Sequence, residues 1–161
     1  MIELFTDGAA QGNPGPGGYG LILRSGKHYK ELSQGFELTT NNRMELLAVI
    51  VGLEQLKKPG TPVTVFSDSK YVVDATEKGW IKGWQARGFK KVKNVDLWKR
   101  FIEIAKQHQV KFKWIKGHAG HPENERCDEL AVLAANAPKK EIDYGYLKSL
   151  ENSDNDLFLE D

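Results

Sequence analysis

The chain has 161 residues, of which 40% are hydrophobic, with 23 basic and 22 acidic side chains. This length suits one domain, and the composition is ordinary for a soluble globular protein. The longest apolar run, 46–53, is too short for a membrane span, and the first residues lack the pattern of a signal peptide. A single cysteine, Cys127, excludes an internal disulfide, so we expect a reducing, cytoplasmic location.

The first third of the chain predicts three strands. Residues 2–7 alternate in polarity and are rich in β-formers, and 19–25 and 28–39 have the same character. A loop rich in glycine and proline, 12–18, separates the first two, and a tight turn joins the second pair. Short connections of this kind predict an antiparallel meander.

Helices and strands alternate in the rest of the chain. The pattern predicts a helix over 43–57 with Asn42 as N-cap, a strand over 62–67, helices over 69–78 and 94–107, a strand over 110–116 and a helix over 122–136. Strands separated by helices imply parallel pairing. The order βββαβααβα therefore predicts an α/β protein whose mixed five-stranded sheet is antiparallel at its first edge, with helices on both faces.

Charge is distributed unevenly along the chain. Residues 78–116 contain twelve Lys or Arg against two acids, which favours a polyanionic partner, the alternative being a solvated helix surface. Residues 151–161 contain five acids and no bases. We expect a catalytic domain over 1–146 and an acidic, disordered tail over 147–161.

Four carboxylates lie in four separate segments: Asp7 in FTDG, Glu45 in NNRMELL, Asp68 in FSDSKY and Asp128 in ERCDEL. Each also has a structural alternative when taken singly. Asp7 could be a turn aspartate and Glu45 a capping-box glutamate. Asp68 could be a helix N-cap and Asp128 a solvent-exposed acid. Asp7 and Asp68 both end apolar strands and Glu45 begins a helix, so they would meet where strand ends gather. Such an oxygen-rich site would bind Mg²⁺, two ions of which, with Mn²⁺ as a substitute, suit phosphodiester chemistry.

Aromatic and basic side chains alternate in the segment GWIKGWQARGFKKVK, residues 79–93. It includes Trp80, Trp84, Lys90 and Lys91. Cations bind phosphates and aromatic faces stack on sugars or bases, so the segment predicts contact with nucleic acid. The alternative is a surface loop anchored by its two tryptophans.

Two histidines, His118 and His121, lie in the loop GHAGHP. The H-E-x-x-H zinc pattern is absent, and the loop glycines favour a histidine that transfers protons, the alternative being a surface histidine. The run GPGGYG at 15–20 fits G-x-G-x-x-G, but it enters a predicted strand rather than a helix, so it predicts no dinucleotide site. Cys127 is expected to be a small buried apolar residue.

Together these motifs resemble those of the type 1 ribonuclease H family in its bacterial single-domain form. The resemblance runs through FTDGAAQGNPGPGGYG, TTNNRMELLAVI, SDSKYV, KNVDLW and WIKGHAGHPENERCDELA. It implies a ribonuclease H-like fold and an endonuclease that hydrolyses the RNA strand of RNA–DNA hybrids by two-metal-ion catalysis. The ends would be 5′-phosphate and 3′-hydroxyl, without strong sequence preference. Two alternatives stay open: another metal-dependent nuclease of this fold, and a hybrid-binding module without catalysis.

The resemblance also implies roles for individual residues. Asp7, Glu45, Asp68 and Asp128 match the metal-binding quartet, and His118 matches a mobile catalytic histidine. Glu125 matches an acid near that histidine. The expected substrate-binding residues are Gln11, Asn13, Thr40, Asn41, Asn42, Lys70, Trp80, Trp84, Lys90 and Lys91.

Some features depart from the family pattern. Lys70 stands where relatives often carry glutamine, Gly83 where they place a polar side chain of a phosphate pocket, and the basic segment 85–94 is short. The acidic tail has no counterpart. It could dock weakly on a replication protein through 157–159, the alternative being a disordered solubilising tail. We expect a monomer.

Overall fold

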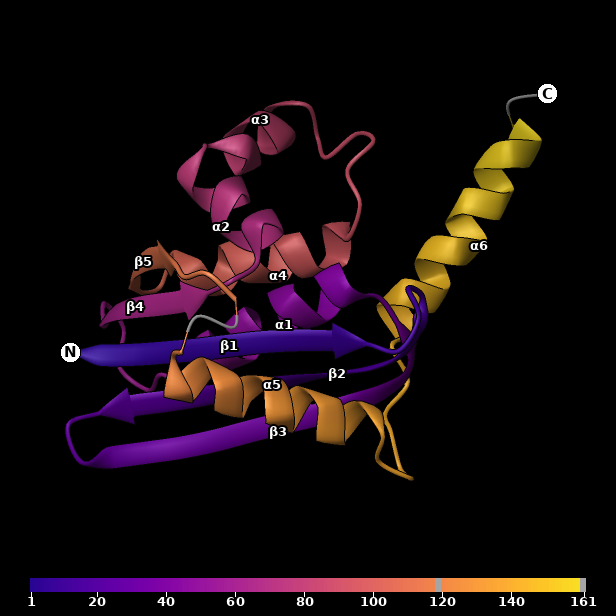
Figure 1. The fold of residues 1–161 in the computed structure, drawn as a ribbon. Coiled ribbons are helices and arrows are strands. Elements are labelled where there is room, and N and C mark those ends of the chain that lie inside the picture. Colours follow the sequence, from indigo (N-terminus) through magenta and orange to yellow (C-terminus); the bar gives the residue numbers. More distant parts are fainter. Residues whose placement is uncertain (118–119, 160–161) are drawn as a thin grey trace.

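A five-stranded mixed sheet forms the centre of the protein (Figure 1). The computed structural model describes residues 1–117 and 120–159. The strands are β1 (Ile2–Ala10), β2 (Gly15–Ser25), β3 (His28–Thr39), β4 (Pro62–Ser67) and β5 (Gln109–Trp114), in the order β3-β2-β1-β4-β5. The pairs β3–β2 and β2–β1 are antiparallel, whereas β1–β4 and β4–β5 are parallel. The predicted mixed sheet is confirmed, although β2 begins at Gly15, inside the expected loop.

Helices cover both faces of the sheet. They are α1 (Asn41–Glu54), α2 (Lys70–Glu77), α3 (Trp80–Ala86), α4 (Val95–Ala105), α5 (Pro122–Ala135) and α6 (Tyr144–Leu159). Helix α1 packs on β1 and β2 with α4 beside it, and α5 lies across β1, β2 and β3 on the opposite face (Figure 1). In the described part of the chain, no helix is both long and apolar enough to cross a membrane.

Two helices, α3 and α6, are missing from the predicted order. In α3 the tryptophans Trp80 and Trp84 stand four residues apart, on one helical face, and Trp84 packs edge-on against Trp98 of α4. Helix α6 continues through Leu159, where the sequence predicts a disordered tail. The division of the chain at residue 146 stays a prediction.

Side chains of the central strands point alternately to the two faces of the sheet and form two hydrophobic cores. Leu4 of β1 and Leu21 of β2 are fully buried in the larger core beneath α1 and α4. Their neighbours Phe5 and Ile22 point to the other face and pack on Cys127 of α5. The two-residue period of a strand therefore decides which helix each side chain meets. Cys127 is fully buried, which confirms the sequence interpretation.

Close contact between α5 and the sheet depends on a glycine. A Cβ atom on Gly20 of β2 would lie 2.3 Å from the Cys127 carbonyl oxygen, closer than any real contact. A larger residue would therefore push α5 outwards. Because Asp128 follows Cys127 directly, this contact also sets the height of the Asp128 carboxylate above the sheet.

The helix N-caps differ from the prediction. Thr40, not Asn42, caps α1: its backbone is extended, with φ −123°, and its hydroxyl accepts a bond from the Arg43 N–H at 3.2 Å. Ser69 caps α2 by accepting a bond from the Val72 N–H at 3.3 Å. Glu45 therefore lies beyond capping-box range, and Asp68 is not an N-cap. Two of the structural alternatives for the carboxylates are thus wrong.

Candidate active site

The parallel pairing of β1 and β4 brings Asp7 and Asp68 to the same end of the sheet. Phe5 pairs with Phe66 in this ladder, and each aspartate lies two residues further along its chain. Neighbouring strands are about 4.8 Å apart. The two carboxylates consequently emerge side by side where the parallel strands end, as strand-end sites in open sheets do.

Glu45 reaches Asp7 because α1 crosses β1 at very short range. A Cβ atom on Gly8 would stand 2.4 Å from the Glu45 amide nitrogen and 2.6 Å from the Met44 carbonyl carbon. Only glycine at position 8 permits this approach. The sequence Asp7-Gly8 therefore supplies both a carboxylate and the room for the helix that carries the second one.

The three acids form a compact ligand set. One oxygen from each of Asp7, Glu45 and Asp68 lies within 4.8 Å of the other two. Asp7 is 8% exposed and Glu45 is 5% exposed. The Glu45 Oε2 atom is buried and has no hydrogen-bond partner among the residues that the structure describes. A buried acceptor of this kind among hard oxygen ligands fits a divalent cation, which would satisfy it.

Burial and mutual repulsion raise the pKa values of the two inner acids. Desolvation, with the nearby charges of Asp68 and Asp128, raises the pKa of Asp7 to about 7, although hydrogen bonds from Glu45 and from the Gly8 N–H oppose the shift. Burial and then the Asp7 charge raise the pKa of Glu45 well above its ordinary value. Without cations the pair therefore holds a proton near neutral pH, which a bound cation would displace.

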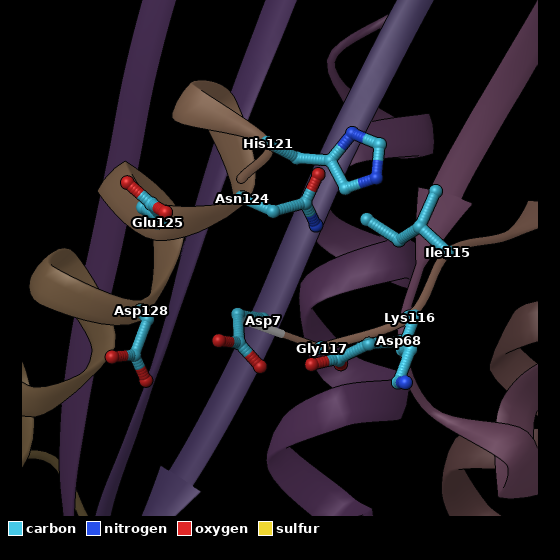
Figure 2. Close-up of a pocket in the computed structure, with 9 residues that line it drawn as sticks. All are labelled: Asp7, Asp68, Ile115, Lys116, Gly117, His121, Asn124, Glu125 and Asp128. Carbon is cyan, nitrogen blue, oxygen red and sulfur yellow. The ribbon is translucent and has the colours of Figure 1, made fainter. Parts of the chain in front are cut away.

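Asp128 joins the same pocket from the opposite face of the sheet. In the view of Figure 2, Asp7 lies between Asp128 on α5 and Asp68. Asp128 lines the pocket with both of them, but it stands outside the compact group of three. Of the other predicted residues, Glu125 also lines the pocket, whereas His118 lies outside the described residues.

The sequence interpretation missed Asn124, which lines this pocket one helical turn before Asp128 (Figure 2). Its Oδ1 atom is buried, and within residues 1–117 and 120–159 it has no hydrogen-bond partner. The sequence could have predicted it, because Asn124 lies four residues before the candidate Asp128 and residues four apart share a helix face. Lys116 and His121 complete the polar lining.

Four predicted substrate-binding residues gather where the β1–β2 loop meets the start of α1. The Asn13 side-chain oxygen accepts a bond from the Asn41 N–H at 3.1 Å. Asn13 lines a groove together with Thr40 and Asn42. All three asparagine side chains are exposed. Donors and acceptors from two segments thus converge on one surface.

The other predicted substrate-binding residues are more dispersed. The Gln11 side chain donates to Asn136 Oδ1, and the Lys70 ammonium lies 4.0 Å from the centre of the Trp114 ring. Trp80 is 43% exposed and remains available to a ligand. Trp84 uses part of its surface to anchor α3 on Trp98. The side chains of Lys90 and Lys91 are exposed.

The sheet order and the buried carboxylates together define a metal-binding hydrolase of the ribonuclease H-like fold. The family model described as RNase H matches residues 1–136. The chain therefore belongs to the ribonuclease H family.

Relatives described as ribonuclease H match most of this chain. It is 57% identical to the ribonuclease H of Desulforamulus reducens over 147 residues, 88% of this chain and 92% of that protein. It is 55% identical to the ribonuclease H of Proteus mirabilis over 157 residues, 94% and 97% of the two chains. The protein is accordingly a ribonuclease H, a nuclease whose acidic group implies a divalent metal.

Solved structures show the same fold. The crystal structure of LC9-RNase H1, a type 1 enzyme with the type 2 active-site motif, matches with a TM-score of 0.74 and 32% identity, over 83% of this chain and 71% of that one. LC11-RNase H1 in complex with RNA/DNA hybrid matches with a TM-score of 0.60 and 29% identity, over 84% and 97%.

Proposed function

We propose that this enzyme is an endonuclease that hydrolyses the RNA strand of RNA–DNA hybrids, with Mg²⁺ as its metal and Mn²⁺ as a substitute. The observation that carries the proposal is the compact group of Asp7, Glu45 and Asp68, in which a buried Glu45 oxygen has no partner in the described part of the chain. The likeness to a solved relative whose structure contains an RNA/DNA hybrid supports the choice of substrate.

The carboxylates have distinct parts in this proposal. Two divalent cations bound here would supply the positive charge that activates water and stabilises the leaving 3′ oxygen, so that the products carry 5′-phosphate and 3′-hydroxyl ends. Asp7 is central in the group and is assigned to both cations. Asp68 supports one side, and Glu45 with Asp128 supports the other. The close approach at Gly8 holds Glu45 in place before the metal arrives.

Proton transfer is assigned to His118. Its loop leads into α5, whose first turns place His121 and Glu125 in the lining of the carboxylate pocket. A histidine changes charge near neutral pH and can accept a proton in one step and release it in another. Glu125 is assigned a supporting role at the mouth of the pocket.

Recognition of the hybrid is assigned to the surface beside the α1 N-terminus. Asn13, Asn41 and Asn42 can donate and accept hydrogen bonds, as contact with a ribose 2′-hydroxyl requires. Thr40 and the exposed lysines would contact phosphates, and the exposed face of Trp80 would pack on a DNA sugar. Contacts of this kind read shape rather than bases, so we expect little sequence preference.

A strand-specific cleavage assay tests the proposal. Hybrids labelled on the RNA strand or on the DNA strand, and duplex DNA, are incubated with the wild type and with Asp7→Asn in Mg²⁺. We expect only the RNA strand of the hybrid to be cut, and only by the wild type. Cutting of duplex DNA at a similar rate would favour another nuclease of this fold, and binding without cutting would favour a hybrid-binding module.

We also propose that the enzyme acts as a cytoplasmic monomer. Its single cysteine, Cys127, is free and cannot form an internal disulfide, as suits a reducing compartment. Docking of the acidic tail on a replication protein stays a prediction. Unchanged binding of such a partner after deletion of residues 151–161 would contradict it.

A further inference from the structure

A second depression has no described lining residue in common with the carboxylate pocket. It is a groove of about 1000 Å³ among the start of α1, the segment that leads into α4 and the first half of α6. Asn13, Thr40 and Asn42 line it, so it is continuous with the surface assigned to hybrid recognition. Helix α6 projects beside these segments in Figure 1.

The groove carries excess positive charge. Its lining includes Lys91, Lys93 and Lys99 from the α4 side and Lys148 from α6. The one acid among the described lining residues is Asp96, and both its oxygens accept bonds from the Arg43 guanidinium, at 2.7 and 2.9 Å. Among the described residues, four lysines from the α4 side and from α6 therefore line the groove, and no carboxylate of that lining lacks an arginine partner.

Helix α6 contributes a lysine and several other polar side chains to the lining of the groove. Lys148 and Asn152, four residues apart, both line the groove, as do Ser149 and Ser153. Glu151 is exposed and lies outside the lining. The described part of the helix thus contributes one cation and several hydrogen-bonding groups to the lining of the groove.

A buried ion-pair cluster fixes the start of α6. Asp143 is 8% exposed and accepts bonds from the Arg43 guanidinium at 2.8 and 2.9 Å and from the Thr39 hydroxyl at 2.7 Å. Its Oδ1 atom also accepts the Tyr146 N–H at 3.1 Å. Next to it, a Cβ atom on Gly145 would lie 2.0 Å from Asp96 Oδ2. The first turn of α6 is therefore held in place through Asp143 by Arg43, which lies two residues before Glu45 in the sequence.

We propose that α6 is a substrate-binding element in which Lys148 contacts a backbone phosphate of the hybrid, outside the stretch held at the carboxylates. The inference rests on the proposed function. The family model ends at residue 136, before this helix begins, so the proposed contact lies outside the part of the chain that the model matches. The occupant is the phosphodiester backbone, because four lysines line the groove and it is continuous with Asn13 and Thr40.

The test measures hybrid binding as a function of salt. Labelled hybrid is titrated in an Asp7→Asn background, so that it is bound but not cut, at 50 to 200 mM salt, with Lys148→Gln, Lys148→Arg and the control Lys27→Gln. Lys148 is exposed, so its replacement leaves the core intact, and Lys27 lies in the β2–β3 turn. Loss of one phosphate contact should lower the salt slope by about 0.7 to 0.9, so that the weakening between 50 and 200 mM is about threefold smaller.

The possible results distinguish a failure of the proposed Lys148 contact from a failure of the proposed ribonuclease H function. We expect Lys148→Gln to weaken binding and flatten the slope, and Lys148→Arg and Lys27→Gln to match the parent. In the catalytically active background, Lys148→Gln should raise KM and leave kcat within twofold. If Lys148→Gln behaves like Lys27→Gln, or if arginine fails to restore the slope, α6 is not a binding element, although the ribonuclease H function stands. If the Asp7→Asn parent binds no hybrid, both the α6 contact and the proposed hybrid substrate are wrong.

Discussion

Replacing Asp7 with asparagine should stabilise the metal-free protein while it abolishes cleavage. Asp7 is 8% exposed, and burial beside Asp68 and Asp128 raises its pKa from an ordinary 3.8 to about 7. The group is therefore charged at pH 8 in a place that disfavours charge. Asparagine has nearly the same shape and removes that charge, so the variant escapes the cost of ionising a buried carboxyl.

The magnitude and its pH dependence follow from the pKa shift. A shift of about three units corresponds to about 4 kcal/mol of free energy between the two protonation states. Because the native pKa is above the unfolded one, the stabilising effect of the Asp7 proton is fully present below pH 3.8 and is lost as pH rises through about 7. The advantage of Asp7→Asn should therefore be small at pH 4 and grow to roughly 2–4 kcal/mol at pH 8.

Urea denaturation with chelator at pH 4, 6 and 8 measures this difference. Glu103→Gln, which removes one partner of an exposed ion pair with Lys106, serves as the control and should change stability by less than about 0.5 kcal/mol. Adding Mg²⁺ should stabilise the wild type and have much less effect on Asp7→Asn. Equal stabilities of the wild type and Asp7→Asn at pH 8, or a difference that does not change with pH, would refute the reasoning.

Three further substitutions probe the site and its support. Glu45→Gln keeps the shape but removes a ligand charge, so kcat for hybrid cleavage should fall on the order of 10³-fold, and near-normal rates would exclude Glu45 from the metal set. Gly8→Ala places a methyl group 2.4 Å from the Glu45 nitrogen. Calorimetry should show that the free energy of unfolding falls by about 1–3 kcal/mol, and kcat should fall as well. Unchanged stability and kcat would mean that α1 can shift freely to make room. Asp143→Ala leaves the buried Arg43 partly unpaired and should cost about 3–5 kcal/mol in urea denaturation, whereas a loss under about 1 kcal/mol would show that the cluster adds little.

The sequence predicted the elements whose patterns are local. The alternation in residues 2–7 and 110–116 and the apolar run 62–67 were sufficient for their strands, and the order of elements was sufficient for the mixed sheet. The convergence of Asp7 with Asp68 was predictable as well, because both follow strands that pair in parallel. Glu45 was harder, since its position depends on a contact with Gly8 that no periodicity reveals.

The features that were missed depend on tertiary contacts. Helix α3 has no buried residue, and it lies against the protein through Trp84 on Trp98. Helix α6 begins where Asp143 meets Arg43, an ion pair between residues a hundred positions apart. In α1, Thr40 competed with Asn42 for the cap, and propensity alone does not separate the two.

Cleavage of an end-labelled RNA–DNA hybrid, followed over a titration of Mg²⁺ against chelator, tests most directly whether the clustered acids act through metal. The wild type should cut the RNA strand with a rate that rises with free Mg²⁺ and vanishes in excess chelator, and Asp7→Asn should be inactive throughout. Undiminished cleavage in excess chelator, or wild-type rates from Asp7→Asn, would contradict the account.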